Sequence, residues 1–274
     1  MPPLALALVL GAACLHAFWN LVIARAADTR ATTALALAIG VVAALPLALL
    51  RWDVQAEAWP YIAASSVIEL VYFWLLTAAY GRADLSLVYP IARGSAPVIV
   101  LLVSVAFLGA MTSVGQIAGV LLVGAGVYLV RGRSAKTRAS DVALALAVAA
   151  SIAAYTLVDR YGVRYADPVT YVVLILVAPA VVTILAVARN GGFRRLHASF
   201  MPITVLGGIA SVAAYGLVLA ALLLAPVASV AATREVSVVI ATGFGALILG
   251  ERVEPARWLG SVVVVVGVAL LALT

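Results

Sequence analysis

The stretches PIARGSAPVIVLL at residues 90–102 and AATREVSVVIATG at residues 231–243 each hold one arginine, Arg93 or Arg234, inside an otherwise apolar run. The two arginines are 141 residues apart, and the segments around them match along their length. An arginine at the centre of a membrane helix costs about 2.5 to 3.5 kcal/mol on insertion scales, so it should face protein or water. Two such residues at equivalent positions predict a cavity between two related halves.

Composition identifies a membrane protein. The 274 residues are 66% hydrophobic and 10% charged, whereas a soluble domain is roughly 45 to 50% apolar and about 25% charged. Ten apolar segments of a length that crosses a bilayer cover residues 3–24, 31–50, 59–80, 85–107, 113–131, 140–159, 168–188, 201–223, 227–249 and 255–273. Continuous apolar runs exclude the alternating strands of a membrane barrel. We therefore expect an all-α, polytopic protein with ten transmembrane helices.

Lys and Arg are distributed unevenly between the connecting loops. Loops after even-numbered segments hold only Arg51, Arg160 and Arg164. Loops after odd-numbered segments hold Arg25, Arg30, Arg82, Arg131, Arg133, Lys136, Arg138, Arg189, Arg194, Arg195, Arg252 and Arg257. We expect a cell membrane (inner or plasma) as the location. The positive-inside rule then places both termini on its extracytoplasmic side.

An internal repeat divides the chain. The offset of 141 residues that pairs the arginines also pairs Gly109 with Gly250, Gly119 with Gly260 and Gly126 with Gly267. We predict a first five-helix repeat at 1–131, a basic cytoplasmic linker at 132–139 and a second repeat at 140–274. An odd number of spans per half inverts the second repeat, which is typical of secondary transporters that bind substrate between repeats.

Other classes of protein lack their motifs here. The chain has no Walker loop, no HExxH motif and no paired acidic motif of a membrane prenyltransferase. Basic residues sit in short loops rather than on a nucleic-acid face, and the single cysteine, Cys14, excludes a multi-thiolate metal site. We predict no enzyme activity, no catalytic residue, no cofactor, no metal and no nucleic-acid partner.

Three stretches resemble the EamA-type branch of the drug/metabolite transporter superfamily: LHAFWNLVIAR in the first segment, YGRADLSLVYPIARGSAPVIV across the third and fourth, and GERVEPARWLGSVVVVVGVALL at the end. The resemblance covers essentially the whole chain, although Gly109-Ala110-Met111 lacks the acidic residue of the Gly250-Glu251-Arg252 turn. It implies a carrier with two inverted five-helix repeats that moves amino acids, amines, sugar derivatives or other small metabolites.

Charged residues inside the segments are the first candidates for a site. Arg93 could dock a substrate carboxylate or phosphonate, or it could form an ion pair that fixes helix packing. Arg234 has the same alternatives, but Glu235 follows it and makes a local pair easier. Glu69, at the centre of 59–80, is the main candidate for proton coupling, with a structural pair to Arg93 as the alternative and Glu235 as its competitor. Asp159 is expected to be an interfacial anchor.

Aromatic and polar residues at helical spacing could line a cavity or pack helices. The candidates for substrate binding are Trp19, Asn20, Tyr72, Tyr89, Arg93, Tyr155, Tyr215, Arg234 and Ser237. Together with the architecture, they predict an alternating-access secondary transporter of small polar metabolites, such as amino acids or related zwitterions and anions, with export left open as its direction. The alternative is a flippase for a lipid-linked amino sugar or a lipid head group. The expected partners are a small-molecule substrate and the lipid bilayer, with a homodimer through 113–131 and 255–273 left open.

Overall fold

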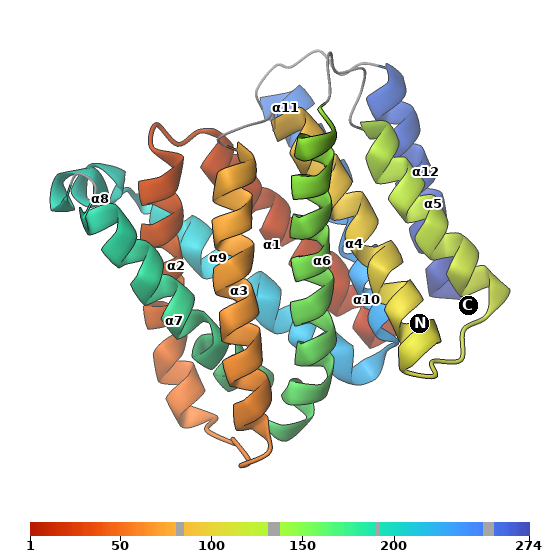
Figure 1. The fold of residues 1–274 in the computed structure, drawn as a ribbon, viewed down its shortest axis with the longest axis horizontal. Helices are drawn as coiled ribbons and strands as arrows, with labels where there is room; N and C mark the ends of the chain where they lie inside the picture. The colour runs from red at the N-terminus through yellow and green to blue at the C-terminus, as the bar shows by residue number, and fades with distance from the viewer. Residues whose placement is uncertain (81–84, 131–137, 190–191, 249–254) are drawn as a thin grey trace.

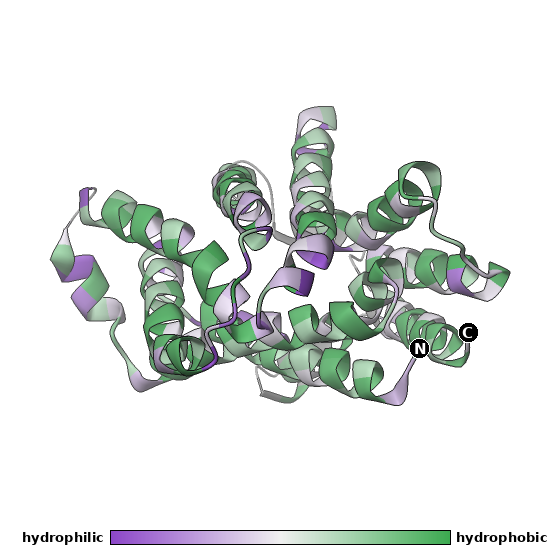
Figure 2. Cartoon of the chain, turned by 90° about the horizontal axis from the view of Figure 1, so that it is seen from below, coloured by the Kyte–Doolittle hydropathy of each residue, from purple (hydrophilic) through white to green (hydrophobic). Residues whose placement is uncertain are grey.

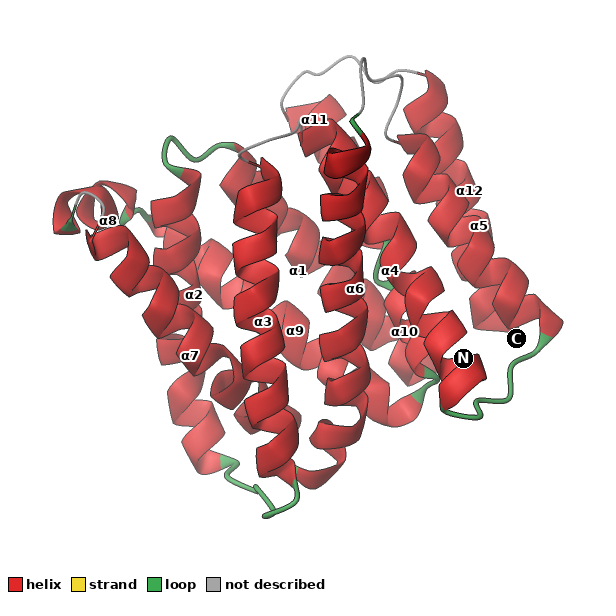
Figure 3. Ribbon diagram, in the orientation of Figure 1, coloured by secondary structure: helices red, strands yellow, loops and turns green. Residues whose placement is uncertain are grey.

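The apolar segments fold as helices in the computed structural model, which describes residues 1–80, 85–130, 138–189, 192–248 and 255–274. The described helices are α1 (Pro3–Ala24), α2 (Thr29–Leu50), α3 (Ala58–Tyr80), α4 (Leu85–Phe107), α5 (Val114–Val130), α6 (Ala139–Gly162), a 3-10 turn η1 (Val163–Tyr165), α7 (Pro168–Arg189), α8 (Phe193–Ser199), α9 (Pro202–Leu224), α10 (Val227–Thr233), α11 (Val236–Ile248) and α12 (Pro255–Leu273). Within these residues there is no strand beyond an isolated bridge of Val54 with Ala166 (Figure 3). The all-α class is confirmed.

Two departures from the predicted segments concern the second half. The segment 227–249, expected as one helix, is divided into α10 and α11 at Arg234 and Glu235. A short helix, α8, forms in the loop after α7, where Gly192 adopts a φ of 72° ahead of its first residue. Most other described boundaries agree with the prediction to within a few residues, because they follow where apolar sequence gives way to Gly, Pro, Asp or Arg.

Six helices within the described residues are long and apolar enough to cross a membrane by length and composition: Pro3–Ala24, Thr29–Leu50, Ala58–Leu76, Ala139–Tyr165, Pro168–Arg189 and Pro202–Leu224. Shorter apolar helices occupy Ile91–Phe107, Val114–Leu129 and Trp258–Leu273. Large apolar side chains are exposed along them, among them Trp74, Phe107 and Leu273, and Figure 2 shows hydrophobic residues predominating along the helices. A surface this apolar is suited to lipid contact.

Helix packing follows the internal repeat. The main contacts between the first half and the second half join α1 to α9, α3 to α6, α1 to α11, α4 to α6, α2 to α9, α3 to α7, α2 to α7, α4 to α10 and α5 to α12 (Figure 1). Exchanging α1 with α6, α2 with α7, α3 with α9, α4 with α10–α11 and α5 with α12 maps this set of contacts onto itself. The two halves therefore contact each other in a pattern with approximate two-fold symmetry.

Glycines show the same symmetry where α5 packs on α12. A Cβ on Gly126 would lie 2.7 Å from the carbonyl oxygen of Gly260, and one on Gly267 would lie 2.8 Å from that of Gly119. Gly119 and Gly126 are the repeat counterparts of Gly260 and Gly267. Gly126 therefore meets Gly260, the counterpart of Gly119, and Gly267 meets Gly119, the counterpart of Gly260. Because these faces are occupied within the chain, a homodimer through α5 and α12 would use their other faces, and it stays a prediction.

Ion pairs tie α2 to the α7–α8 segment at both ends. Asp28 caps the start of α2 by accepting from the Ala31 N–H at 3.0 Å, and Arg195 of α8 binds its two carboxylate oxygens at 2.7 and 3.0 Å. At the other end, Arg51 lies 3.7 Å from Asp167, which accepts from the Val169 N–H at the start of α7. We call these contacts the Asp28 clamp and the Asp167 clamp. They occupy equivalent places in the two halves, at opposite ends of α2.

Candidate functional site

The two intramembrane arginines converge on one carboxylate. Arg93 Nε lies 2.9 Å from Glu235 Oε2, and Arg93 Nη2 donates to the Ser237 hydroxyl at 3.1 Å. Arg234 Nε lies 3.9 Å from Glu235 Oε1. All four residues are buried, with Glu235 and Ser237 fully so. We call this group the arginine centre. Two guanidinium charges share one carboxylate, so the centre carries a net positive charge.

A tight turn between α10 and α11 brings Glu235 and Ser237 to Arg93. The N–H groups of Glu235, Ser237 and Val238 donate to carbonyls three residues earlier, at 3.0, 3.1 and 2.9 Å, rather than four residues earlier. This 3-10-type geometry winds the chain more tightly than an α-helix and is often found where a helix is interrupted for function. The ion pairs of Glu235 with Arg93 and Arg234 provide protein contacts where α10 gives way to α11. A discontinuous membrane helix needs such contacts because lipid cannot satisfy its polar groups.

Asp159, on α6, is a second buried carboxylate. Its expected role as an interfacial anchor is wrong, because α6 continues to Gly162 and Asp159 is 0% exposed. The Tyr171 hydroxyl donates to Oδ1 at 3.1 Å, and the Tyr215 hydroxyl donates to Oδ2. Two hydroxyl donors from α7 and α9 therefore hold a carboxylate contributed by α6.

Glu69 belongs to this acidic part rather than to Arg93. Its side chain is buried on α3, and the charged groups that act on it are Asp159 and Arg234, with Tyr215 beside it. Among the described residues Glu69 makes no ion pair with Arg93, whose carboxylate partner is Glu235. We call Glu69, Asp159, Tyr171 and Tyr215 the acidic centre. The structure thus separates two acids that sequence reasoning treated as competitors for one role.

Three tyrosine rings connect the acidic centre with α3 and α6. The ring centroids of Tyr72 and Tyr155 are 5.9 Å apart at 77°, and those of Tyr155 and Tyr215 are 5.9 Å apart at 74°. Edge-to-face contacts of this kind fix ring orientation. Tyr72, Tyr155 and Tyr215, predicted as separate lining residues, therefore form one aromatic row that ends on Asp159.

The remaining predicted residues, Trp19, Asn20 and Tyr89, belong to α1 and α4. Trp19 is half-buried on α1 against α9, where a Cβ on Gly207 would lie 3.1 Å from its ring. Asn20 is half-buried beside it. Tyr89 falls within α4, but its side chain is outside the described residues. Substrate binding by each of these residues stays a prediction.

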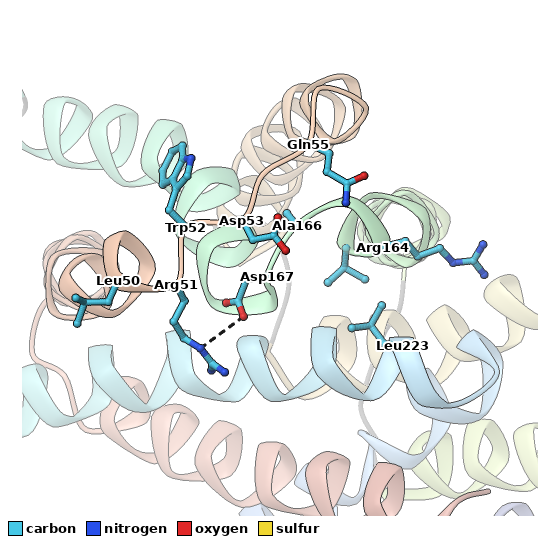
Figure 4. A pocket seen from close by; sticks show the side chains of 10 residues that line it. Leu50, Arg51, Trp52, Asp53, Gln55, Arg164, Ala166, Asp167 and Leu223 are labelled. Atoms are coloured by element: carbon cyan, nitrogen blue, oxygen red, sulfur yellow. Dashed lines mark ion pairs between the residues drawn. The ribbon is translucent and has the colours of Figure 1, made fainter.

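A surface hollow of about 560 Å³ opens at the Asp167 clamp, and no residue of the two centres lines it. Figure 4 shows Arg51 and Asp167 facing each other at its edge. Its lining comprises Leu50, Arg51, Trp52, Asp53, Gln55, Val163, Arg164, Ala166, Asp167 and Leu223. Backbone hydrogen bonds of 2.9 Å from Gln55 to Tyr165 and from Asp167 to Asp53 join the two loops there. No group of His, Cys, Asp and Glu within the described residues could hold a metal ion.

The model of the EamA-like transporter family matches residues 3–132 and again residues 140–273. The chain belongs to the EamA-like transporter family. Membership makes it a multi-pass membrane transporter by family, in agreement with its apolar helices. The two matches also fit the internal repeat of the EamA fold.

A solved structure described as "Crystal structure of protein" is similar over 98% of this chain and 97% of its own, with a TM-score of 0.75 and 16% identity. At that identity the likeness concerns the fold alone. Among curated proteins, none matches the chain.

Proposed function

We propose that this EamA-family protein is a secondary transporter of small polar metabolites that works by alternating access, with amino acids or related zwitterions as substrates. The observation that carries the proposal is Glu235 held between Arg93 and Arg234. A substrate carboxylate is the same chemical group as the Glu235 carboxylate and can engage the planar guanidinium fork in the same manner. The arginine centre is thus suited to bind and release an anionic group of the substrate.

Architecture supports alternating access. We propose ten membrane crossings, with α10 and α11 together forming one of them, and two five-helix repeats of opposite orientation at 1–131 and 140–274. The exchange of contacts between equivalent helices supports this arrangement. In inverted-repeat carriers substrate sites lie between the repeats, beside interrupted helices. The interrupted α10–α11 segment meets α4 of the first half through Arg93.

Localisation and direction belong to the same proposal. We propose a cell inner membrane with residues 132–139 in the cytoplasm, and export as the direction of transport. The basic loops after odd-numbered segments support the orientation. Both chain ends lie together, since the Met1 ammonium donates to the Ala272 carbonyl at 3.2 Å.

The proposal is tested by ligand screening followed by transport. Amino acids, quaternary amines and phosphonates are screened for a thermal shift on purified protein, and each ligand found is assayed by counterflow in proteoliposomes. We expect zwitterions to give both responses, with Arg93→Ala reducing flux at least about tenfold because the carboxylate loses its charged donor. Arg194→Ala, which removes an exposed arginine of α8, is the matched control. Response to a lipid-linked sugar, with none to zwitterions or anions, would contradict the proposal in favour of a flippase.

A further inference from the structure

Within the described residues, the buried acids of the acidic centre form no ion pair with a guanidinium group. Arg93 pairs with Glu235 and donates to Ser237, and Arg234 Nε lies 3.9 Å from Glu235 Oε1. Asp159, by contrast, is stabilised through hydroxyl groups of Tyr171 and Tyr215. Hydroxyl donors orient a carboxylate, but they leave its charge uncompensated.

A further polar group, the Ser65 hydroxyl, lies near Asp159. The Ser65 hydroxyl, fully buried on α3 one turn before Glu69, lies beside Asp159. It has no hydrogen-bond partner of standard geometry within the described residues. A buried hydroxyl left in this way loses free energy unless a ligand or water completes its bonding. The Ser65 hydroxyl therefore lies near the two carboxylates of the acidic centre.

Aromatic rings border this place on one side. Tyr215 donates to Asp159, and its ring continues the row through Tyr155 to Tyr72. Carboxylates combined with aromatic faces are the surroundings that proteins use to bind ammonium groups, through charge pairing and cation–π attraction. The arginine centre offers the opposite polarity, and Arg234 lies close enough to both acids to act on them.

We propose that Asp159 binds the ammonium group of a zwitterionic substrate and thereby decides between amino acids and simple carboxylates. This inference rests on the proposed function, in which the arginine centre takes the carboxylate. Tyr171 and Tyr215 act as positioning residues that hold the Asp159 carboxylate toward the ligand. The Ser65 hydroxyl, beside Asp159, completes the ammonium site. A molecule with both charges spans the two centres, whereas a carboxylate alone leaves Asp159 unpaired.

The test compares matched ligands that differ by the amino group alone. Binding of L-leucine and 4-methylpentanoate, and of 6-aminohexanoate and hexanoate, is measured by calorimetry on the purified full-length protein and on Asp159→Asn. The second pair covers a longer separation between the charges. We expect the variant to lose at least about tenfold in affinity for an amino acid that the wild-type protein binds, because a buried charge pair is removed. Affinity for its deaminated partner should stay within about twofold of the wild-type value.

Two control variants keep the result interpretable. Asp141→Asn, near the start of the same helix and outside both centres, should bind all four ligands as the wild-type protein does. If Asp159→Asn does not fold, Tyr171→Phe serves in its place and should show the same selective loss in smaller degree.

The outcomes separate the two proposals. An equal loss for both members of a pair, or no loss for either, would overturn the role of Asp159 while leaving the carboxylate site in place. Failure of the wild-type protein to bind any of the four ligands would count against the proposed function itself.

Discussion

Glu235 connects the two halves of the protein by charge, because it pairs with Arg93 of the first half as well as with Arg234 of its own half. Its adjacency to Arg234 predicts a local pair, and that pair exists at 3.9 Å. The closer partner is Arg93, 142 positions away at 2.9 Å. Sequence periodicity identifies costly residues inside apolar helices, but it does not say which of them meet, because pairing depends on how helices from different halves pack.

The same limit applies to Asp159 and Tyr171. Asp159 was expected at an interface because apolar sequence ends near it, whereas one further turn of α6 buries it completely. Tyr171 begins a long apolar run and has no distinguishing spacing. Only the packing of α6 against the neighbouring helices brings the two side chains within hydrogen-bonding distance.

Glu69 is expected to carry the coupling proton. The described polar interior holds three carboxylates, of Glu69, Asp159 and Glu235, against the guanidinium groups of Arg93 and Arg234. One surplus negative charge is costly in a membrane interior, and one proton neutralises it. Glu235 is held by arginines and Asp159 by hydroxyl donors, which leaves Glu69 for the proton. Glu69→Gln should therefore abolish uptake driven by a pH gradient in proteoliposomes while counterflow continues.

The comparison variant for Glu69→Gln is Glu57→Gln, which changes an exposed acid before α3. It should retain both activities. Undiminished pH-driven uptake by Glu69→Gln would assign the proton to another group.

At the scale of helices, the Asp28 clamp predicts a dependence of stability on pH. The hydrogen bonds from Arg195 lower the pKa of the Asp28 carboxyl group below its ordinary value. A carboxyl group with a lowered pKa in the folded state stabilises that state above its unfolded pKa, and this contribution is lost as the pH falls through the folded pKa. Because Asn also caps helices well, Asp28→Asn removes the ion pair and leaves the cap in place.

Thermal melting between pH 7 and pH 3 measures the effect of Asp28→Asn. We expect the variant to melt about 1 to 2 °C below the wild-type protein at pH 7, since exposed ion pairs are weak. The difference should vanish at the acidic end. Equal melting temperatures at pH 7 would show that the clamp does not stabilise the α2 and α7–α8 contact.

The crossed glycines of α5 and α12 allow a sharper test of packing. Gly126→Ala would force a methyl group to within 2.7 Å of the Gly260 carbonyl oxygen, and backbone cannot move aside as a flexible side chain can. Overpacking of this kind costs about 1 to 3 kcal/mol. A lowered unfolding free energy in mixed micelles is the expected result.

Gly243→Ala is the control for Gly126→Ala, because a Cβ at Gly243 meets nothing within 4 Å. Alanine there should be neutral or slightly stabilising, since it favours helix over glycine. Equal effects at both glycines would mean that close helix approach is not what Gly126 provides.

Helix bounds are the part of the fold that sequence predicts well. The segments 85–107 and 255–273 agree with α4 and α12, since hydropathy and the Gly, Pro and Arg residues that flank them are local properties. The interruption at Arg234 is not local in origin. Residues 227–249 read as one apolar run, and the tight turn is accompanied by the contact of Glu235 and Ser237 with Arg93 on α4.

For the molecule as a whole, orientation in the membrane is tested by reporter fusions. GFP fluoresces when folded in the cytoplasm, and alkaline phosphatase is active outside it. With both termini outside, a phosphatase fused after residue 274 should be active, and GFP fused there should be dark. GFP inserted within residues 132–137 of the full chain should be bright. The reverse pattern would place the basic loops outside and contradict the orientation inferred from them.

The difference between Gly94 and Glu235 has a consequence for the energetics of the cycle. These residues are counterparts at the offset of 141, yet one packs against the α5 backbone and the other holds two arginines. Identical inverted halves would give inward- and outward-open forms of equal free energy. Unequal halves do not, and a gap of about 1.4 kcal/mol already shifts the populations tenfold. We therefore expect the empty carrier to rest facing one side, with different half-saturating substrate concentrations at its two faces.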